Sequence, residues 1–186
     1  IKKHKKVSHY TYGRYGSTTT IELENILKEL EQAYHVFLTG TGFGGIALAL
    51  MSLCRPGDEI LVSDNVYGPT KEISQELLRE FSVSAKFYNP DSFEDLKNKI
   101  STKTKMILVE NPGSNTFEFQ DLSKIVNLAK KNKIYTAIDN TWGTPYLLKP
   151  ISLGFDMSIV SATKYYSGHS DVMGGSLAIN KRVFKL

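Results

Sequence analysis

The chain has 186 residues, of which 41% are hydrophobic, and its 23 basic and 19 acidic side chains give a formal net charge of +4. This composition is typical of a soluble globular protein with a buried core. The single cysteine, Cys54, excludes a disulfide within the chain, and its apolar neighbours predict a packed thiol rather than a nucleophile. The longest apolar run, 46–53, is too short to span a bilayer, so we predict a cytoplasmic protein without membrane contact.

The start of the chain combines two unusual compositions. Residues 2–6 are rich in lysine but lack the arginine and aromatic residues of a nucleic-acid site, so we expect a solvated tail and no nucleic-acid partner. Residues 10–16 are rich in tyrosine and glycine, which predicts an extended loop. Either this loop is an ordinary surface loop, or its Tyr12 and Arg14 reach a phosphate. The first residue is not methionine and the last follows a predicted strand, so we expect both ends to be cuts through a longer protein.

A helix, a strand and a glycine-rich turn follow. The helix is predicted by apolar residues that recur on one face, with Thr20 as the expected N-cap; they are Leu23, Ile26, Leu27, Leu30 and Tyr34. A strand over 35–38 leads into glycines between 40 and 45 and a helix over 46–53. This order predicts an anion site built from backbone N–H groups. A tight turn without a ligand gives the same pattern.

Strands and helices then alternate to the end of the chain. Strands are predicted over 59–63, 85–88, 106–109, 134–138, 157–160 and 176–179. Between them we predict a loop centred on Tyr67, a helix over 70–81 that buries Ile73, Leu77 and Leu78, a helix that starts at an Asp91–Glu94 capping box, and a helix capped by Asp121. The alternation predicts an α/β fold with a mainly parallel sheet that helices cover on both faces.

Polar residues follow two of these strands directly. Asp139 ends the strand over 134–138, and Ser161, Thr163 and Lys164 come after the strand over 157–160. Open α/β sheets bind ligands at this edge. No Cys/His spacing predicts a metal site, and the sequence lacks the nucleophile elbow that a hydrolase would need. Pyridoxal phosphate fits the pattern, because it needs a lysine for its aldehyde, an aspartate for its ring nitrogen and N–H groups for its phosphate.

The segment Ser161-Ala162-Thr163-Lys164-Tyr165, followed by Gly168-His169-Ser170-Asp171, closely resembles the lysine motif of the Cys/Met-metabolism family of pyridoxal-phosphate enzymes. The segment 138–142 also resembles that family, and within it the segment 110–114 is most similar to the cystathionine β-lyase branch. The resemblance extends from about Tyr12 to the end of the chain. It implies the large cofactor-binding domain of a fold-type-I, aminotransferase-like enzyme.

The resemblance also implies roles for single residues. Lys164 would bind the cofactor covalently and act in catalysis, Asp139 would pair with the ring nitrogen, and Tyr67 would stack on the ring and take part in catalysis. The phosphate would be bound by the N–H groups of Gly42 and Phe43, by the hydroxyls of Ser161 and Thr163, and by Tyr12 and Arg14 of a neighbouring subunit. The last pair favours the phosphate-reaching interpretation of the early loop and implies a homo-oligomer, a dimer or a tetramer.

The implied function is a carbon–sulfur lyase that splits cystathionine, a small sulfur-containing amino acid, by β-elimination into homocysteine, pyruvate and ammonia. Residues 1–20 would be an extended segment that reaches a neighbouring subunit, and residues 21–186 the cofactor-binding domain, without the family's smaller C-terminal domain. Two alternatives remain: a fragment of such an enzyme without catalysis, from a split or decaying gene or a cut through the chain, or a γ-lyase or γ-synthase of the same family.

Overall fold

The computed structural model describes residues 12–186, so the lysine-rich segment over 2–6 lies outside the described residues. One seven-stranded sheet runs through the chain in the order β1-β7-β6-β5-β4-β2-β3. Its strands are β1 (His35–Thr39), β2 (Glu59–Ser63), β3 (Ser84–Tyr88), β4 (Thr104–Glu110), β5 (Tyr135–Asp139), β6 (Met157–Val160) and β7 (Gly175–Ile179). β7 pairs antiparallel with β1 and β6, and the other pairs are parallel. The predicted mainly parallel α/β fold is confirmed.

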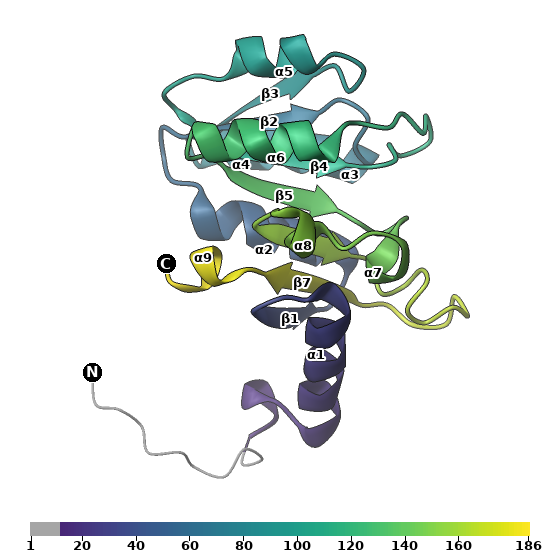
Figure 1. Cartoon of the computed structure of the whole chain (residues 1–186). Coiled ribbons are helices and arrows are strands. Elements are labelled where there is room, and N and C mark those ends of the chain that lie inside the picture. The colour runs from purple at the N-terminus through teal and green to yellow at the C-terminus, as the bar shows by residue number, and fades with distance from the viewer. Residues whose placement is uncertain (1–11) are drawn as a thin grey trace.

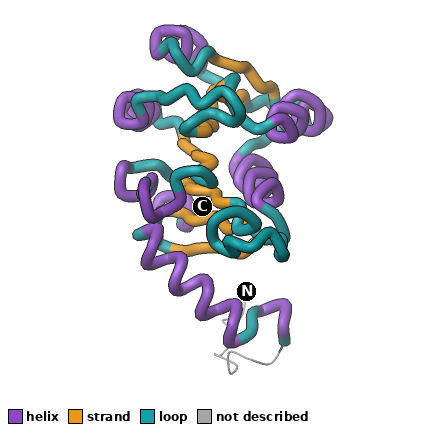
Figure 2. Tube along the Cα trace, turned by 90° about the vertical axis from the view of Figure 1, so that its right-hand side faces the viewer, coloured by secondary structure: helices purple, strands orange, loops and turns teal. Residues whose placement is uncertain are grey.

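Helices cover both faces of the sheet (Figure 2). One face carries α2 (Gly42–Leu53) and a continuous helical segment made of α3 (Gly68–Glu72), the π-helical turn η2 (Ile73–Leu77) and α4 (Leu78–Glu80). The other face carries α1 (Thr18–Glu31), α5 (Phe93–Lys99), α6 (Leu122–Lys131) and α8 (Pro150–Leu153). The short helices η1 (Gly13–Tyr15), α7 (Thr144–Leu147) and α9 (Lys181–Phe184) lie at connections and near the termini (Figure 1).

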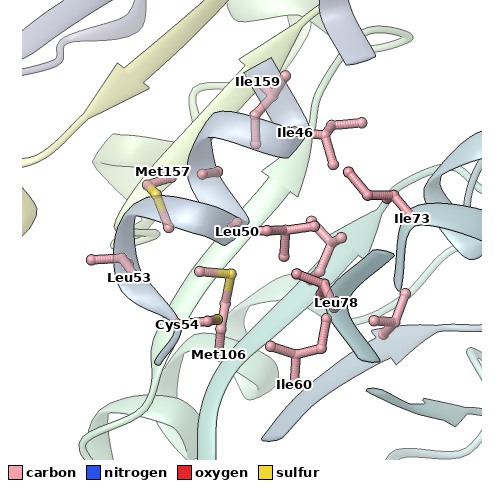
Figure 3. Packing of buried hydrophobic residues seen from close by; sticks show 14 of the residues in the cluster. Ile46, Leu50, Leu53, Cys54, Ile60, Ile73, Leu78, Met106, Met157 and Ile159 are labelled. Atoms are coloured by element: carbon pink, nitrogen blue, oxygen red, sulfur yellow. The ribbon is translucent and has the colours of Figure 1, made fainter. Parts of the chain in front are cut away.

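The hydrophobic core fills the two spaces between the sheet and its helices. On the α2 side, Ile46 and Leu50 pack with Ile60, Met106 and other side chains of the central strands (Figure 3). On the opposite side, α5 and α6 pack on the other face of the same strands. The central strands β2, β4 and β6 are therefore buried on both faces, as expected for a mainly parallel sheet that helices cover on both sides. Each fully buried aliphatic side chain contributes about 1.5–3 kcal/mol to folding.

The predicted first helix forms, but its cap and its apolar face differ from expectation. Ser17, not Thr20, is the N-cap, and the two residues make a reciprocal capping box in which Ser17 N–H donates to Thr20 Oγ1 at 2.8 Å. Only Leu27 and Glu31 of α1 are buried. Leu23, Ile26 and Leu30 stay 44–54% exposed, because the helix extends beyond the edge of the sheet and only its C-terminal part packs on β1 and β7 (Figure 1).

Two other helices depart from the sequence prediction. In the segment predicted over 70–81, the π-helical turn changes the spacing of the backbone hydrogen bonds from four residues to five. Ile73 and Leu78 are therefore buried on one face, while Leu77 is 41% exposed. The N-cap of α5 is Ser92, whose hydroxyl accepts from Asp95 N–H, and the predicted cap at Asp91 is wrong. The cap of α6 at Asp121 is confirmed.

Two further features concern single residues and the membrane. Cys54 is buried as predicted, and burial, with a smaller contribution from Asp58, raises the pKa of its thiol to about 11. Within residues 12–186, every helix is too short or too polar to cross a bilayer.

Candidate active site

Two carboxyl groups lie side by side at the carboxyl edge of the sheet. Glu110 and Asp139 are the last residues of β4 and β5 and are direct partners in the parallel register. Asp139 Oδ1 accepts from Thr141 N–H at 3.0 Å, and Glu110 Oε2 accepts from Tyr67 N–H at 2.7 Å. Burial and then repulsion by Asp139 raise the pKa of Glu110 to about 8, and burial also raises the pKa of Asp139.

The segment after β6 carries the predicted lysine to the same edge. Ser161 N–H donates to Thr141 Oγ1 at 2.8 Å, which ties the start of this segment to the end of β5. Lys164 N–H donates to Ser161 O, and Gly168 N–H donates to Lys164 O, so the lysine sits in a tight turn. Thr163 Oγ1 accepts from Gly174 N–H at 3.2 Å and fixes the far side of that turn. The prediction that an acid and an amine end neighbouring strands is confirmed.

A cavity of about 630 Å³ opens beside these residues. Its lining includes Glu110, Ser114, Trp142, Thr163 and Lys164. Residues from three connections that are distant in the sequence therefore face one space. The cavity combines an amine, an acid, hydroxyls and an aromatic surface, which suits a flat polar ligand.

The glycine-rich turn lies against the lysine segment. A Cβ atom on Gly42 would come within 2.5 Å of Ser161 Cβ, so only glycine permits this approach. Thr41 caps α2 by accepting from Gly44 N–H at 2.8 Å. The helix begins at Gly42 rather than at residue 46, because the glycines form its first turn. The N–H groups of that turn and the hydroxyl of Ser161 are thereby brought together, which is the arrangement that an anion needs.

Not all predicted site residues come together. Gly42, Asp139, Ser161, Thr163 and Lys164 gather at the carboxyl edge, and Tyr67 joins them through its N–H bond to Glu110. The side chain of Phe43 instead lines a separate groove against α3 and η2, which leaves only its backbone N–H for the predicted role.

Tyr12 and Arg14 lie apart from this group. The Arg14 guanidinium stacks at 5.2 Å from the ring centre of Tyr12 and at 5.7 Å from that of Tyr15, and all three are exposed. Their segment lies beyond the end of α1, away from the sheet (Figure 1).

Glu110 is not among the site residues predicted from the sequence, although it ends a continuous apolar strand just as Asp139 does. That position was the available signal. The sequence could not show that the strands of Glu110 and Asp139 are neighbours in the sheet. Among residues 12–186, no group of three His, Cys, Asp or Glu side chains is placed to hold a metal ion.

Residues 1–185 match the sequence profile of the family described as "Cys/Met metabolism PLP-dependent enzyme". The chain belongs to this family. The site fits pyridoxal phosphate, the cofactor of the family, on two observations: a glycine cradle packed on Ser161, and a cavity that Lys164 lines next to a carboxyl pair. The predicted cofactor is thus that of the family to which the chain belongs.

Individual members of the family are similar over almost the whole chain. A putative cystathionine beta-lyase of Saccharomyces cerevisiae is 39% identical over 175 residues, which are 94% of this chain and 52% of that protein. The crystal structure of metB from Corynebacterium glutamicum superimposes with a TM-score of 0.92 at 28% identity, over 97% of this chain and 47% of the other. A putative O-acetylhomoserine (thiol)-lyase, metY, of Campylobacter jejuni, whose structure carries a pyridoxyl-lysine phosphate, gives a TM-score of 0.88 at 30% identity, over 94% and 43%. The chain spans about half the length of the curated relatives it matches.

Proposed function

We propose that this chain is the cofactor-binding part of a pyridoxal-phosphate-dependent carbon–sulfur lyase, which splits cystathionine by β-elimination into homocysteine, pyruvate and ammonia. The observation that carries the proposal is that Lys164 and Glu110, the sheet partner of Asp139, line one cavity. The choice of cystathionine is supported by relatives that are named cystathionine beta-lyase. In this proposal residues 21–186 form the cofactor-binding domain.

In the proposed site, each gathered residue has a separate task. Lys164 binds the cofactor covalently, and Asp139 holds the proton on the ring nitrogen. The N–H groups of Gly42 and Phe43 and the hydroxyls of Ser161 and Thr163 hold the phosphate. Tyr67 stacks on the ring. When bound, the cofactor supplies an electron sink for bond cleavage at the substrate Cα.

Lys164 is also the proposed general base. Its Nζ, on an exposed turn that lines the cavity, would be freed when the substrate's own amino group replaces it at the cofactor, and could then take the proton from Cα of the amino-acid substrate. Asp139 keeps its role throughout, because its Oδ1 is fixed by Thr141 N–H and its carboxyl is held at the end of a buried strand. Trp142 and Ser114, on opposite loops of the cavity, are the walls that would contact the substrate side chain.

A homo-oligomer, a dimer or a tetramer, completes the proposal. Residues 1–20 would reach a neighbouring subunit, with Tyr12 and Arg14 at its phosphate. Two observations support this: the exposed Tyr12–Arg14 pair has no contact with its own site, and the apolar stripe of α1 is left uncovered beside Tyr146 and Leu147, which are 89% and 67% exposed. An apolar surface of this kind is typical of a protein interface.

Specific observations support two other functions for this chain. A γ-lyase or γ-synthase is supported by the structural similarity to metB and metY. A non-catalytic piece is supported by the length of the chain, which is about half that of its relatives.

The test has two arms. The chain is incubated with pyridoxal phosphate, reduced with borohydride and mapped by peptide mass; we expect the label on Lys164 and none in Lys164→Ala, and an unlabelled wild-type chain would favour the non-catalytic piece. The full-length protein is then given cystathionine and assayed for pyruvate. Release of 2-oxobutyrate in place of pyruvate would point to the γ-lyase, and pyruvate formation that survives Lys164→Ala would refute the assignment.

A further inference from the structure

Glu110 has no task in the proposed site, yet it holds one of that site's key residues. Its Oε2 accepts from the backbone N–H of Tyr67 at 2.7 Å, across 43 positions of sequence. The same carboxyl lines the cavity with Lys164 and lies opposite Asp139 in the sheet. It therefore binds Tyr67 and lies next to Asp139 in the sheet, the two residues that would contact the cofactor ring from different sides.

Apart from this bond, the backbone of Tyr67 is held by its own carbonyl, which accepts from Thr70 N–H at 2.9 Å and from Lys71 N–H at 3.2 Å in the first turn of α3. The side chain of Tyr67 is 48% exposed, and no hydrogen bond of its hydroxyl is present in the described structure. The residue forms the N-cap of α3 without a side-chain cap, so its backbone is the joint between the end of β2 and that helix. A half-exposed ring on such a joint takes its place from the backbone, and among residues 12–186 Glu110 is the only partner of that backbone N–H.

The rest of the loop is tied to the same connection. Ser114 N–H donates to Asn65 O at 2.8 Å, and Gly113 packs directly on Asn65, since a Cβ on Gly113 would come within 2.6 Å of Asn65 Cβ. The 110–114 segment thus supports the 65–67 segment at both ends. Of these contacts, only the one from Glu110 reaches Tyr67.

A carboxyl group is a costly acceptor at this place. Asp139 lies beside it, and no lysine or arginine forms an ion pair with either acid within residues 12–186. An uncharged acceptor would make the same bond to Tyr67 without repulsion. The bond itself, rather than the charge, is therefore the contribution that can be isolated by substitution.

We propose that Glu110 is a positioning residue of the active site, which holds Tyr67, through its backbone N–H, beside the cavity that Glu110 itself lines. The inference rests on the proposed function in one respect, the stacking of Tyr67 on the cofactor ring. It adds a residue that none of the proposed cofactor contacts includes.

The test compares two substitutions of nearly equal shape. Glu110→Gln and Glu110→Met both remove the ionisable carboxyl group, but only glutamine keeps an oxygen that can accept from Tyr67 N–H. Glu94→Met, on the exposed face of α5, is the matched control. Amide hydrogen exchange of Tyr67 in the cofactor-free chain is the first measurement. We expect exchange to be about tenfold faster in Glu110→Met and near the wild-type rate in Glu110→Gln and Glu94→Met. Unchanged exchange in Glu110→Met would overturn the proposal.

Cofactor affinity is the second measurement. We expect Glu110→Met to weaken pyridoxal phosphate binding by roughly five- to tenfold, as for one lost hydrogen bond, and Glu110→Gln to restore it. In a Tyr67→Ala background the Glu110→Met change should have no further effect, because its route is through Tyr67. An equal loss in both backgrounds would show that Glu110 acts independently of Tyr67 and would contradict the proposal.

The two measurements separate the two hypotheses. If the wild-type chain binds no pyridoxal phosphate, the proposed function of the chain fails, while the exchange rates still decide whether Glu110 holds Tyr67. If the cofactor binds and labels Lys164 but the exchange of Tyr67 is unaffected by Glu110→Met, the proposed function stands and the inference about Glu110 is wrong.

Discussion

Buried acidic side chains have opposite surroundings, and pKa shifts of opposite sign, at the two edges of the sheet. At the amino edge, Glu59 pairs with Lys86 at 2.6 Å and accepts from Ser101 and Thr104. Burial opposes its ionisation, but these donors outweigh burial and lower the pKa of Glu59. At the carboxyl edge, neither Glu110 nor Asp139 forms an ion pair with any residue that the structure describes, and the pKa of both is raised.

Asp156 completes the contrast. This residue is buried at the amino edge, where it pairs with Arg182 at 3.1 Å and accepts from Thr136 N–H and from the Asn180 amide. The amino edge is thus closed by its own chain, and its acids stabilise the fold. The uncompensated pair at the carboxyl edge destabilises the free chain, which is typical of a site that a ligand completes.

The largest change in stability is expected from a substitution at the amino edge, where the buried acids have partners within the chain. Asp156→Ala leaves Arg182 without its partner and removes the acceptor of Thr136 N–H and the Asn180 amide. We expect the free energy of unfolding to fall by about 3 kcal/mol, as for other buried ion pairs that lose one member. Urea unfolding measures it. A loss no larger than that of an exposed control, Glu94→Ala, would show that the amino edge does not depend on this pair.

A second prediction concerns packing at the open edge. Gly42→Ala places a methyl group against Ser161, and we expect a loss of about 2 kcal/mol from overpacking, together with weaker pyridoxal phosphate binding. Gly68→Ala is the control, because a Cβ there meets no atom within 4 Å. Equal stability and affinity of the two variants would mean that the turn and the lysine segment are not in contact.

The third prediction uses pH. The unfolded glutamate releases its proton near pH 4.5, whereas Glu110 in the folded chain keeps it until about pH 8. Between these values the folded state binds more protons, so stability falls as pH rises. We expect the free energy of unfolding to fall more steeply for wild type than for Glu110→Gln between pH 5 and pH 8.

A matched substitution tests whether this pH effect is specific. Burial raises the pKa of Glu31 to about 7, so Glu31→Gln should flatten the same curve on its own and leave the contribution of Glu110 in place. Parallel curves for wild type and Glu110→Gln, measured by urea unfolding at each pH, would refute the raised pKa of Glu110.

The smallest expected change in stability is a gain, whereas Asp156→Ala is expected to cause a loss. Asp139→Asn removes the repulsion between Asp139 and Glu110, so we expect the cofactor-free chain to gain about 1 kcal/mol in stability at pH 8. The same change should weaken pyridoxal phosphate binding, because the amide cannot hold the ring nitrogen in its protonated form. Urea unfolding and a cofactor titration give the two values. A loss of stability like that of Asp156→Ala would erase the difference between the edges.

Part of the site was predictable because strand ends can be located from local pattern. Asp139 and Lys164 follow apolar runs, and residues that end adjacent parallel strands meet at one edge. The motif around Lys164 added the family. Glu110 had the same local signal, but its importance depends on β4 being the neighbour of β5, which is a property of the sheet order.

Other features depended on competition between local signals. Ser17 and Thr20 are both good N-caps, and only the path of the backbone decided which one starts α1. The π-helical turn at Ile73 moved Leu77 out of the core because tertiary packing, not helical period, selected Ile73 and Leu78. Helical periodicity could not show that Leu23, Ile26 and Leu30 stay exposed, since a stripe for a partner and a stripe for the core have the same sequence pattern.

The sequence by itself determined the alternation of strands and helices, the two-sided burial of the central strands and the residues that end them, because these follow from apolar periodicity and turn chemistry. The family followed from the motif at Lys164. Tertiary structure alone decided the strand order, the contact of Gly42 with Ser161, the bond from Tyr67 to Glu110 and the partners of each buried acid. These contacts join residues far apart in the chain, and their energies depend on distances that no local pattern contains.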